Sequence, residues 1–177
     1  AKKQGKKALL VGHGVGAWIS FVVAQLRPDL VTGIVGMSAD PDFTEELLWK
    51  KLPEHVKNKI MEDGVYEIEW GEDKYPISRN LIEDGRSNLL LSGGPQSLKI
   101  SCPVRLIHSI SDKEVPYEFA MKLVENCQTQ DAMLTLAKNS NHNFETEADM
   151  KCMRAAIQDV LESYQPGQWD LSSPGSG

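Results

Sequence analysis

The chain has 177 residues, of which 41% are hydrophobic and 25% are charged, and this is the ordinary composition of one soluble globular domain. Its formal net charge of -6 at pH 7 argues against a general affinity for nucleic acid or for anionic membrane surfaces. No apolar run approaches the ~20 residues that span a bilayer, so we expect no membrane span.

The first residues are basic, but no apolar stretch follows them, so they do not form a secretory signal. The cysteines are odd in number and widely spaced, which predicts free thiols in an intracellular reducing compartment. They are Cys102, Cys127 and Cys152. None has the spacing of metal ligands, and the sequence predicts neither a metal site nor a cofactor.

The first predicted elements are a strand, a tight turn and a helix. The apolar run 8–11 predicts the strand, and Gly-His-Gly-Val-Gly at 12–16 predicts the turn. Apolar residues with helical spacing follow, at Trp18, Ile19, Val22, Val23 and Leu26. A G-x-S-x-G motif requires this order, because the turn lifts its central side chain above the sheet, beside the N-terminus of the helix. Here the central residue is Gly14, which supplies no hydroxyl.

The same turn also fits a relaxed dinucleotide-binding loop, G-x-G-x-x-A, that ends at Ala17. Such a loop needs an acidic residue at the end of the next strand, about 20 residues further on. The apolar run 31–37 predicts that strand, and Asp40 follows it as a poor candidate. Nucleotide binding is therefore the weaker alternative.

Strand and helix alternation is interrupted between residues 40 and 99, which we interpret as a lid-like insertion. Start and stop signals predict a short helix over 44–49 and another over 53–64. Alternating residues predict a strand over 65–70, followed by a turn at 71–73. A helical pattern returns over 78–91.

Two later strands lead into the residue types of a catalytic pair. The buried strand predicted over 102–108 is followed by Asp112, and the strand predicted over 132–137 is followed by His142. The chain order is therefore turn, acid, histidine. This is the order of the α/β-hydrolases, and it differs from the orders in chymotrypsin-like and subtilisin-like enzymes.

With these motifs the chain resembles the α/β-hydrolase superfamily over residues 7–164. It is most similar to the mitochondrial palmitoyl-protein thioesterase and acyl-glucuronide esterase group. The motifs are Gly-His-Gly-Val-Gly-Ala-Trp at 12–18, Cys-Pro-Val-Arg-Leu-Ile-His-Ser-Ile-Ser-Asp-Lys-Glu-Val-Pro at 102–116 and Ser-Asn-His-Asn-Phe at 140–144. The resemblance implies the C-terminal part of an α/β-hydrolase fold, with a mostly parallel sheet, flanking helices and the front strands absent from domain 1–164. It also implies a mitochondrial location.

By the same resemblance Gly14 stands at the nucleophile position, Asp112 at the acid and His142 at the base. The backbone amide of Val15 belongs to the oxyanion hole, for which the second donor loop is missing. In this superfamily an insertion at this place carries a lid. The resemblance therefore implies an acyl site lined by Trp49, Met61, Tyr66 and Trp70, although a residue of any of these types, taken singly, is more often part of a hydrophobic core than of a binding site. We interpret His13, His108 and Ser20 as structural.

Acyl transfer needs an oxygen or sulfur nucleophile, which glycine lacks. We therefore predict a non-catalytic hydrolase relative with a structural or ligand-binding role. The alternative is a serine carboxylic-ester or acyl-thioester hydrolase in an inactivated or incomplete form. The expected partners are an acyl ligand and strands from a missing segment or another chain. The stretch 165–177, rich in Pro, Gly and Ser, is predicted as a disordered or tag-like tail.

Overall fold

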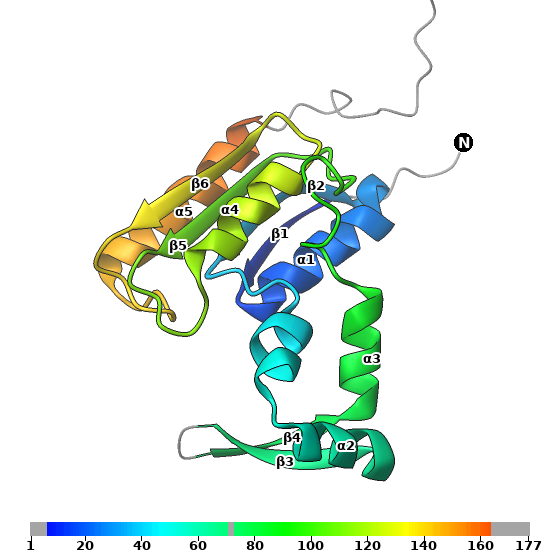
Figure 1. Ribbon diagram of the computed structural model, residues 1–177. Coiled ribbons are helices and arrows are strands. Elements are labelled where there is room, and N and C mark those ends of the chain that lie inside the picture. Colours follow the sequence, from blue (N-terminus) through cyan, green and yellow to red (C-terminus); the bar gives the residue numbers. More distant parts are fainter. Residues whose placement is uncertain (1–6, 71–72, 164–177) are drawn as a thin grey trace, which may run out of the picture. The chain divides into compact units, whose positions relative to one another are not determined.

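The computed structural model describes residues 7–70 and 73–163, so the predicted tail 165–177 lies outside the described residues (Figure 1). Of residues 70 and 73 only the backbone is described. The chain divides into two compact units. The first contains the described parts of Ala1–Pro41 and Leu91–Gly177, and the second is Asp42–Leu90.

The first unit is built on a four-stranded sheet in the order β1-β2-β5-β6. All three strand pairs are parallel. The strands are β1 (Ala8–His13), β2 (Val31–Met37), β5 (Val104–Ser109) and β6 (Ala132–Ala137). The sequence predicted each of them, and the predicted fold class is confirmed.

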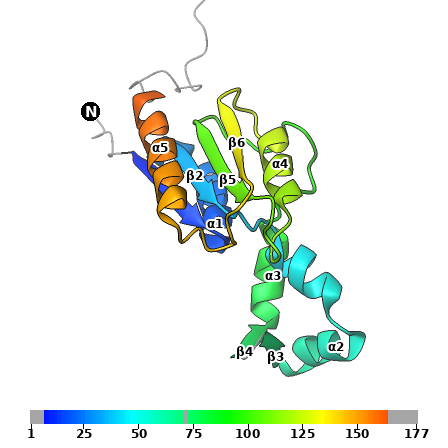
Figure 2. The same ribbon diagram turned by 90° about the vertical axis from the view of Figure 1, so that its left-hand side faces the viewer.

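Helices cover both faces of this sheet (Figures 1 and 2). They are α1 (Val15–Leu26), α4 (Tyr117–Asn126) and α5 (Glu147–Ser163). Helices α1 and α4 lie on one face, and α5 lies on the other (Figure 2). Two glycines of β2 allow the helices to approach. A Cβ on Gly33 would lie 2.3 Å from Cγ1 of Val160 in α5, and a Cβ on Gly36 would lie 3.2 Å from Cβ of Ala17 in α1.

The second unit contains α2 (Glu54–Asp63), β3 (Val65–Trp70), β4 (Asp73–Ser78) and α3 (Arg79–Ser87). Two short helical turns precede them, η2 (Thr44–Leu48) and η3 (Trp49–Lys51). Strands β3 and β4 pair as an antiparallel hairpin. The apolar residues of this unit gather in one cluster, formed by Leu48, Val56, Ile60, Ile77 and Ile82.

Strand β4 was not predicted, because its sequence contains Lys74 and Pro76 and a proline argues against a strand. Among residues 7–70 and 73–163, β4 pairs only with β3, and on its other edge the N–H that Pro76 lacks costs no ladder bond. The helix predicted over 78–91 was too long, since α3 ends at Ser87. Its start was correct, and the Ser78 hydroxyl accepts the Leu81 N–H at 3.1 Å as an N-cap.

No helix among residues 7–70 and 73–163 is long and apolar enough to cross a membrane.

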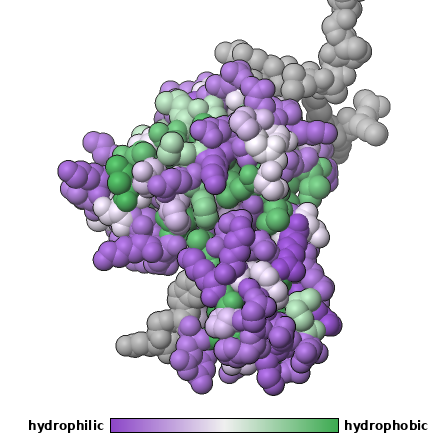
Figure 3. Space-filling model, viewed as in Figure 1, coloured by the Kyte–Doolittle hydropathy of each residue, from purple (hydrophilic) through white to green (hydrophobic). Residues whose placement is uncertain are grey.

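The β1 edge of the sheet exposes apolar surface. Within the described residues β1 pairs only with β2, so its other edge is open. Val11 in β1 is 45% exposed, and in α1 Ile19 is 57% and Leu26 is 72% exposed. Hydrophobic atoms at the surface near α1 are visible in Figure 3. An open strand beside exposed apolar side chains favours pairing with a further strand.

We therefore expect the isolated 177-residue chain to associate through this edge, and light scattering measures the association. Ile19→Glu places a charge beside the edge and should shift the chain toward monomer. Leu161→Glu is the matched control, because Leu161 is 53% exposed but lies on α5, on the other face of the sheet. A monomer in which hydrogen exchange shows the β1 amides as protected as those of β2 would contradict this expectation.

Candidate active site

The turn between β1 and α1 has the backbone of a nucleophile elbow. Gly14 has φ 54° and ψ -122°, a conformation that side chains rarely adopt. Its N–H donates to the Met37 carbonyl at the end of β2, at 2.9 Å. Its carbonyl accepts the N–H of Ala17 at 3.0 Å and that of Asp40 at 3.3 Å. The turn is therefore held from β2, from α1 and from the loop that follows β2.

The elbow has room for a side chain at its centre. A Cβ built on Gly14 would meet no heavy atom within 4 Å. A Cβ on Gly12 would lie 2.4 Å from the backbone of Gly16, so Gly12 is required by the close approach of strand and helix. The local fold thus presents position 14 in the open, although the sequence supplies only hydrogen there.

Asp112 and His142 form a hydrogen-bonded pair. The Nδ1–H of His142 donates to Oδ2 of Asp112 at 2.9 Å. The other carboxylate oxygen, Oδ1, accepts the backbone N–H groups of Glu114 at 2.9 Å and Val115 at 3.0 Å. The Asp112 side chain is fully buried, whereas 17% of the His142 side chain is exposed. The carboxylate therefore orients the imidazole from inside the protein.

The Asp112 carboxyl is ionised at neutral pH. Burial opposes its ionisation, but the Val115 N–H and the His142 ring stabilise the anion more strongly, so its pKa lies below the usual value. An ionised carboxylate accepts the Nδ1–H of His142 and leaves Nε2 as the nitrogen that can take a proton.

The loop that carries His142 is tied to the elbow. The His142 carbonyl accepts the hydroxyl of Ser38 at 2.6 Å and lies 2.8 Å from Nε2 of His13. The rings of His13 and His142 meet edge to face, with centroids 5.0 Å apart. Because His13 directly precedes Gly14, these contacts bring the sequence-predicted residues Gly14, Asp112 and His142 together.

Further bonds fix the same loop on its far side. The Ser140 carbonyl accepts the Ser109 hydroxyl at 2.5 Å, and the Ser140 hydroxyl donates to Asp149 in α5. The Asn141 side chain accepts the N–H of Phe144 at 3.0 Å. Phe144 is 1% exposed, so it anchors the loop in the core. His142 is thus held by its neighbours on both sides.

Val15, the predicted oxyanion donor, is the first residue of α1, and no side chain caps that end of the helix. The predicted acyl-lining residues belong to the second unit. Trp49 packs against its apolar cluster, with the Arg86 guanidinium 4.6 Å from its ring centroid. The side chain of Trp70 lies outside the described residues.

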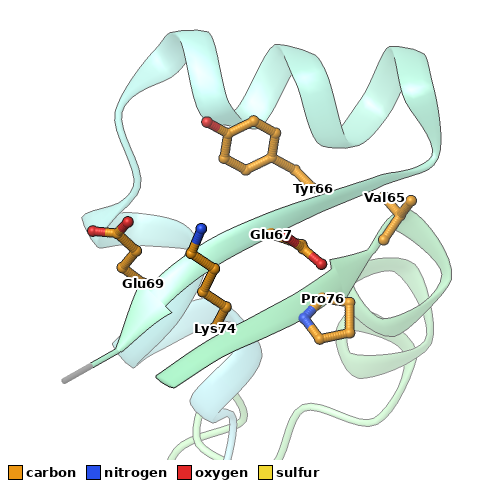
Figure 4. Close-up of a pocket in the computed structure, with 6 residues that line it drawn as sticks. All are labelled: Val65, Tyr66, Glu67, Glu69, Lys74 and Pro76. Carbon is orange, nitrogen blue, oxygen red and sulfur yellow. The ribbon is translucent and has the colours of Figure 1, made fainter. Parts of the chain in front are cut away.

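Tyr66 lines a pocket of about 580 Å³ on the hairpin (Figure 4). The other lining residues are Val65, Glu67, Glu69, Lys74 and Pro76. Three charged groups in this lining make it a poor environment for an acyl chain. The pocket therefore adds nothing to the acyl-site prediction.

Other chemistry finds little support in the described part of the chain. Within it, no group of three or more His, Cys, Asp or Glu side chains is placed to hold a metal ion. Burial raises the pKa of the Cys102 thiol to about 11 and that of the Cys127 thiol to about 12. Both remain protonated thiols at neutral pH, which makes them weak nucleophiles.

Two residues that contact the Asp112–His142 pair were not among the predicted site residues. Ser38 was not singled out, although its buried hydroxyl holds the His142 carbonyl. The φ angle of Ser38 is 43°, in the left-handed region, and no sequence pattern predicts this conformation for a serine. His108 was interpreted as a strand-end residue, but its Nε2 lies 3.3 Å from Oδ2 of Asp112.

The pH dependence of stability tests the state of Asp112. Because its folded-state pKa is lowered, its contribution is complete above the unfolded value of about 4 and is lost as the pH falls through the folded value. We expect Asp112→Asn to reduce the free energy of unfolding by about 1–3 kcal/mol near neutral pH, and by less below about pH 4.

Urea denaturation at several pH values measures this difference. Asp29→Asn is the matched control, because Asp29 pairs with Arg27 on the surface and its side chain is 62% exposed. The control should leave stability unchanged. A loss for Asp112→Asn that stays constant across the acidic range would contradict the ionised state.

Comparisons with known proteins reveal relatives, although no family model matches the chain. It is 28% identical over 157 residues to the mitochondrial palmitoyl-protein thioesterase ABHD10 of Bos taurus and 26% identical to that of Homo sapiens. Both alignments cover 87% of this chain and 50% of the relative. The chain therefore spans about half the length of these curated relatives.

Solved structures agree with this likeness. A crystal structure of a proposed hydrolase from Agrobacterium vitis S4 matches with a TM-score of 0.78 and 31% identity, over 89% of this chain and 62% of that one. Alpha/beta hydrolase domain-containing protein 10 from mouse matches with a TM-score of 0.76 and 22% identity, over 92% and 64%. These matches support the hydrolase interpretation of the glycine turn over the dinucleotide one.

Proposed function

Because the chain belongs to the α/β-hydrolase superfamily and is related to its esterases and thioesterases, we propose that it binds acyl esters or thioesters without forming an acyl-enzyme. Gly14 takes the nucleophile position, Asp112 and His142 form the acid and base pair, and the Val15 amide faces the acyl oxygen. The proposed role is therefore ligand binding or structural. The printed names of the curated relatives include the word mitochondrial, and we extend that location to this chain as part of the proposal.

One observation carries the proposal. An ordered pair of acid and base side chains lies beside an elbow that has no nucleophilic side chain. In acyl transfer a hydroxyl or thiol attacks the acyl carbon while the histidine takes its proton and the carboxylate holds the histidine. Here Asp112 binds Nδ1 of His142, which leaves Nε2 to act as the base. Gly14 provides no oxygen or sulfur, so no covalent acyl intermediate can form at the elbow.

The proposed ligand follows from the chemistry of the relatives. Two of them are named palmitoyl-protein thioesterases, so we assign the ligand class as a fatty-acyl thioester or ester. The N-terminus of α1 places its partial positive charge beside the elbow, where an acyl carbonyl oxygen would accept the Val15 N–H. Trp49 and Trp70 remain candidate lining residues under this proposal.

A second candidate function is a serine hydrolase in an inactivated or incomplete form. It is favoured by the room for a side chain at position 14 and by the intact Asp112–His142 bond. Both candidates keep Asp112 and His142 as a pair, so a serine restored at position 14 tests the roles given to that pair.

We expect the unchanged chain to form no covalent adduct with a fluorophosphonate or an activated acyl ester, whereas Gly14→Ser becomes labelled at position 14. The serine pays about 1–3 kcal/mol of backbone strain. Adding His142→Ala to Gly14→Ser should abolish labelling, because the hydroxyl loses its base. Intact-protein mass spectrometry measures the adduct.

Gly64→Ser is the matched control for this experiment. Gly64 also has a positive φ, 83°, and open space around its Cβ position, but it ends α2 in the second unit, where the sequence predicts no base. It should suffer similar strain and remain unlabelled. A covalent adduct on the unchanged chain would refute the non-catalytic proposal. Labelling of Gly14→Ser that survives His142→Ala would refute the roles given to the pair.

Ligand binding is tested separately with a non-hydrolysable acyl-thioester analogue in which a methylene group replaces sulfur. We expect it to shift the backbone amide resonance of Val15 and the ring resonances of His142 in NMR spectra of the unchanged chain. Two results would contradict an acyl site at the elbow. One is that the shifts are confined to the hairpin of Tyr66. The other is that this chain shows no shifts at an analogue concentration that saturates a full-length relative.

A further inference from the structure

We propose that His108 is a positioning residue that holds the Asp112 carboxylate toward His142. His108 lies in β5, four residues before Asp112, and is fully buried. The inference rests on the proposed function, in which Asp112 and His142 work as a pair, but its geometry is independent of any reaction. Nothing in the proposed acyl chemistry uses the His108 ring directly.

The contacts of His108 define its tautomer. Its Nε2 lies 3.0 Å from the Val115 carbonyl and 3.3 Å from Oδ2 of Asp112, and both of these atoms are acceptors. Nε2 therefore carries the proton. The other nitrogen, Nδ1, is buried and has no hydrogen-bond partner within the described residues. A proton on Nδ1 would be left unpaired, so the ring is a neutral donor through Nε2.

The charge state follows from the same surroundings. Burial lowers the pKa of His108, and this effect outweighs the opposing effects of the Val115 carbonyl and the Asp112 carboxylate. The nearby His142 also disfavours a positive charge on His108. A neutral His108 donates to Asp112 without neutralising it, so the carboxylate keeps its charge for His142.

His108, Val115 and Asp112 close a ring of hydrogen bonds. Val115 donates its N–H to Oδ1 of Asp112 at 3.0 Å and accepts the His108 N–H on its carbonyl. His108 therefore contacts Oδ2 of the carboxylate and also holds the residue that binds Oδ1. Since Oδ2 is the oxygen that His142 uses, rotation of the carboxylate away from His142 would break the bonds on both oxygens.

His108→Met tests the inference in the unchanged chain. Methionine has a similar volume, donates no hydrogen bond and removes the unpaired Nδ1, so circular dichroism should report a preserved fold. The readout is the low-field NMR resonance of the His142 Nδ1 proton, assigned by its absence in His142→Ala. We expect this resonance to be lost in His108→Met and kept in His108→Gln, whose terminal amide can donate in place of Nε2.

His55→Gln is the matched control, because His55 is an exposed histidine of the second unit, and it should leave the resonance unchanged. In the Gly14→Ser background the rate of fluorophosphonate labelling is the second readout. We expect a loss of about tenfold or more for His108→Met and recovery to within about threefold for His108→Gln, because small misplacements of catalytic groups cost up to ~10² in rate.

The outcomes separate this inference from the proposed function. If the acyl-thioester analogue shifts the resonances of neither Val15 nor His142 but His108→Met still removes the Nδ1 proton resonance, the positioning role stands and the proposed function falls. If His108→Met folds and changes neither readout, His108 is merely structural and the inference is overturned. Should His108→Met fail to fold, His108→Asn replaces it with the same expectations, because its shorter side chain stays polar but does not reach Asp112.

Discussion

The buried carboxylate of Asp112 is the group on which the arrangement of the site depends. A buried ion is stable only when several hydrogen-bond donors surround it. Four groups surround the Asp112 carboxylate, which are the N–H groups of Glu114 and Val115 and the rings of His108 and His142. Each donor is thereby fixed by the ion that it stabilises. This charge links the ends of β5 and β6 in addition to the Ser109–Ser140 hydrogen bond, so the position of His142 is tied to the sheet.

The elbow adds a second constraint, which concerns shape and not charge. The contact of Gly12 with the backbone of Gly16 forces the sharp passage from β1 into α1. The unusual backbone of Gly14 follows from that passage and needs no side chain to maintain it. The elbow backbone is therefore kept with glycine at its central position.

The sequence was sufficient to predict the four strands of the sheet, because each strand is an apolar run that ends in a turn. Buried parallel strands have this pattern. The sequence also placed Asp112 and His142 after the ends of two parallel strands, and their side chains are hydrogen-bonded in the structure, while their roles as acid and base stay a prediction. It failed for β4, where Pro76 and the charged neighbours concealed a strand that forms only by pairing with β3. It also failed for Ser38, because its contact with the His142 carbonyl joins residues 104 positions apart in the chain. No local pattern encodes such contacts.

The absence of a side chain at Gly33 links the packing of β2 to the loop that carries His142. Val160 of α5 rests where a Cβ of residue 33 would be, and the N-terminal turn of the same helix carries Asp149, which binds Ser140 two residues before His142. A methyl group at position 33 would overlap Val160, so the Val160 side chain or α5 would have to shift, and a shift of α5 would disturb the Asp149–Ser140 bond. Packing in the middle of β2 is therefore linked to the position of the His142 imidazole through α5. Within the described residues, none of the hydrogen bonds named above joins this helix to Asp112 or to the elbow.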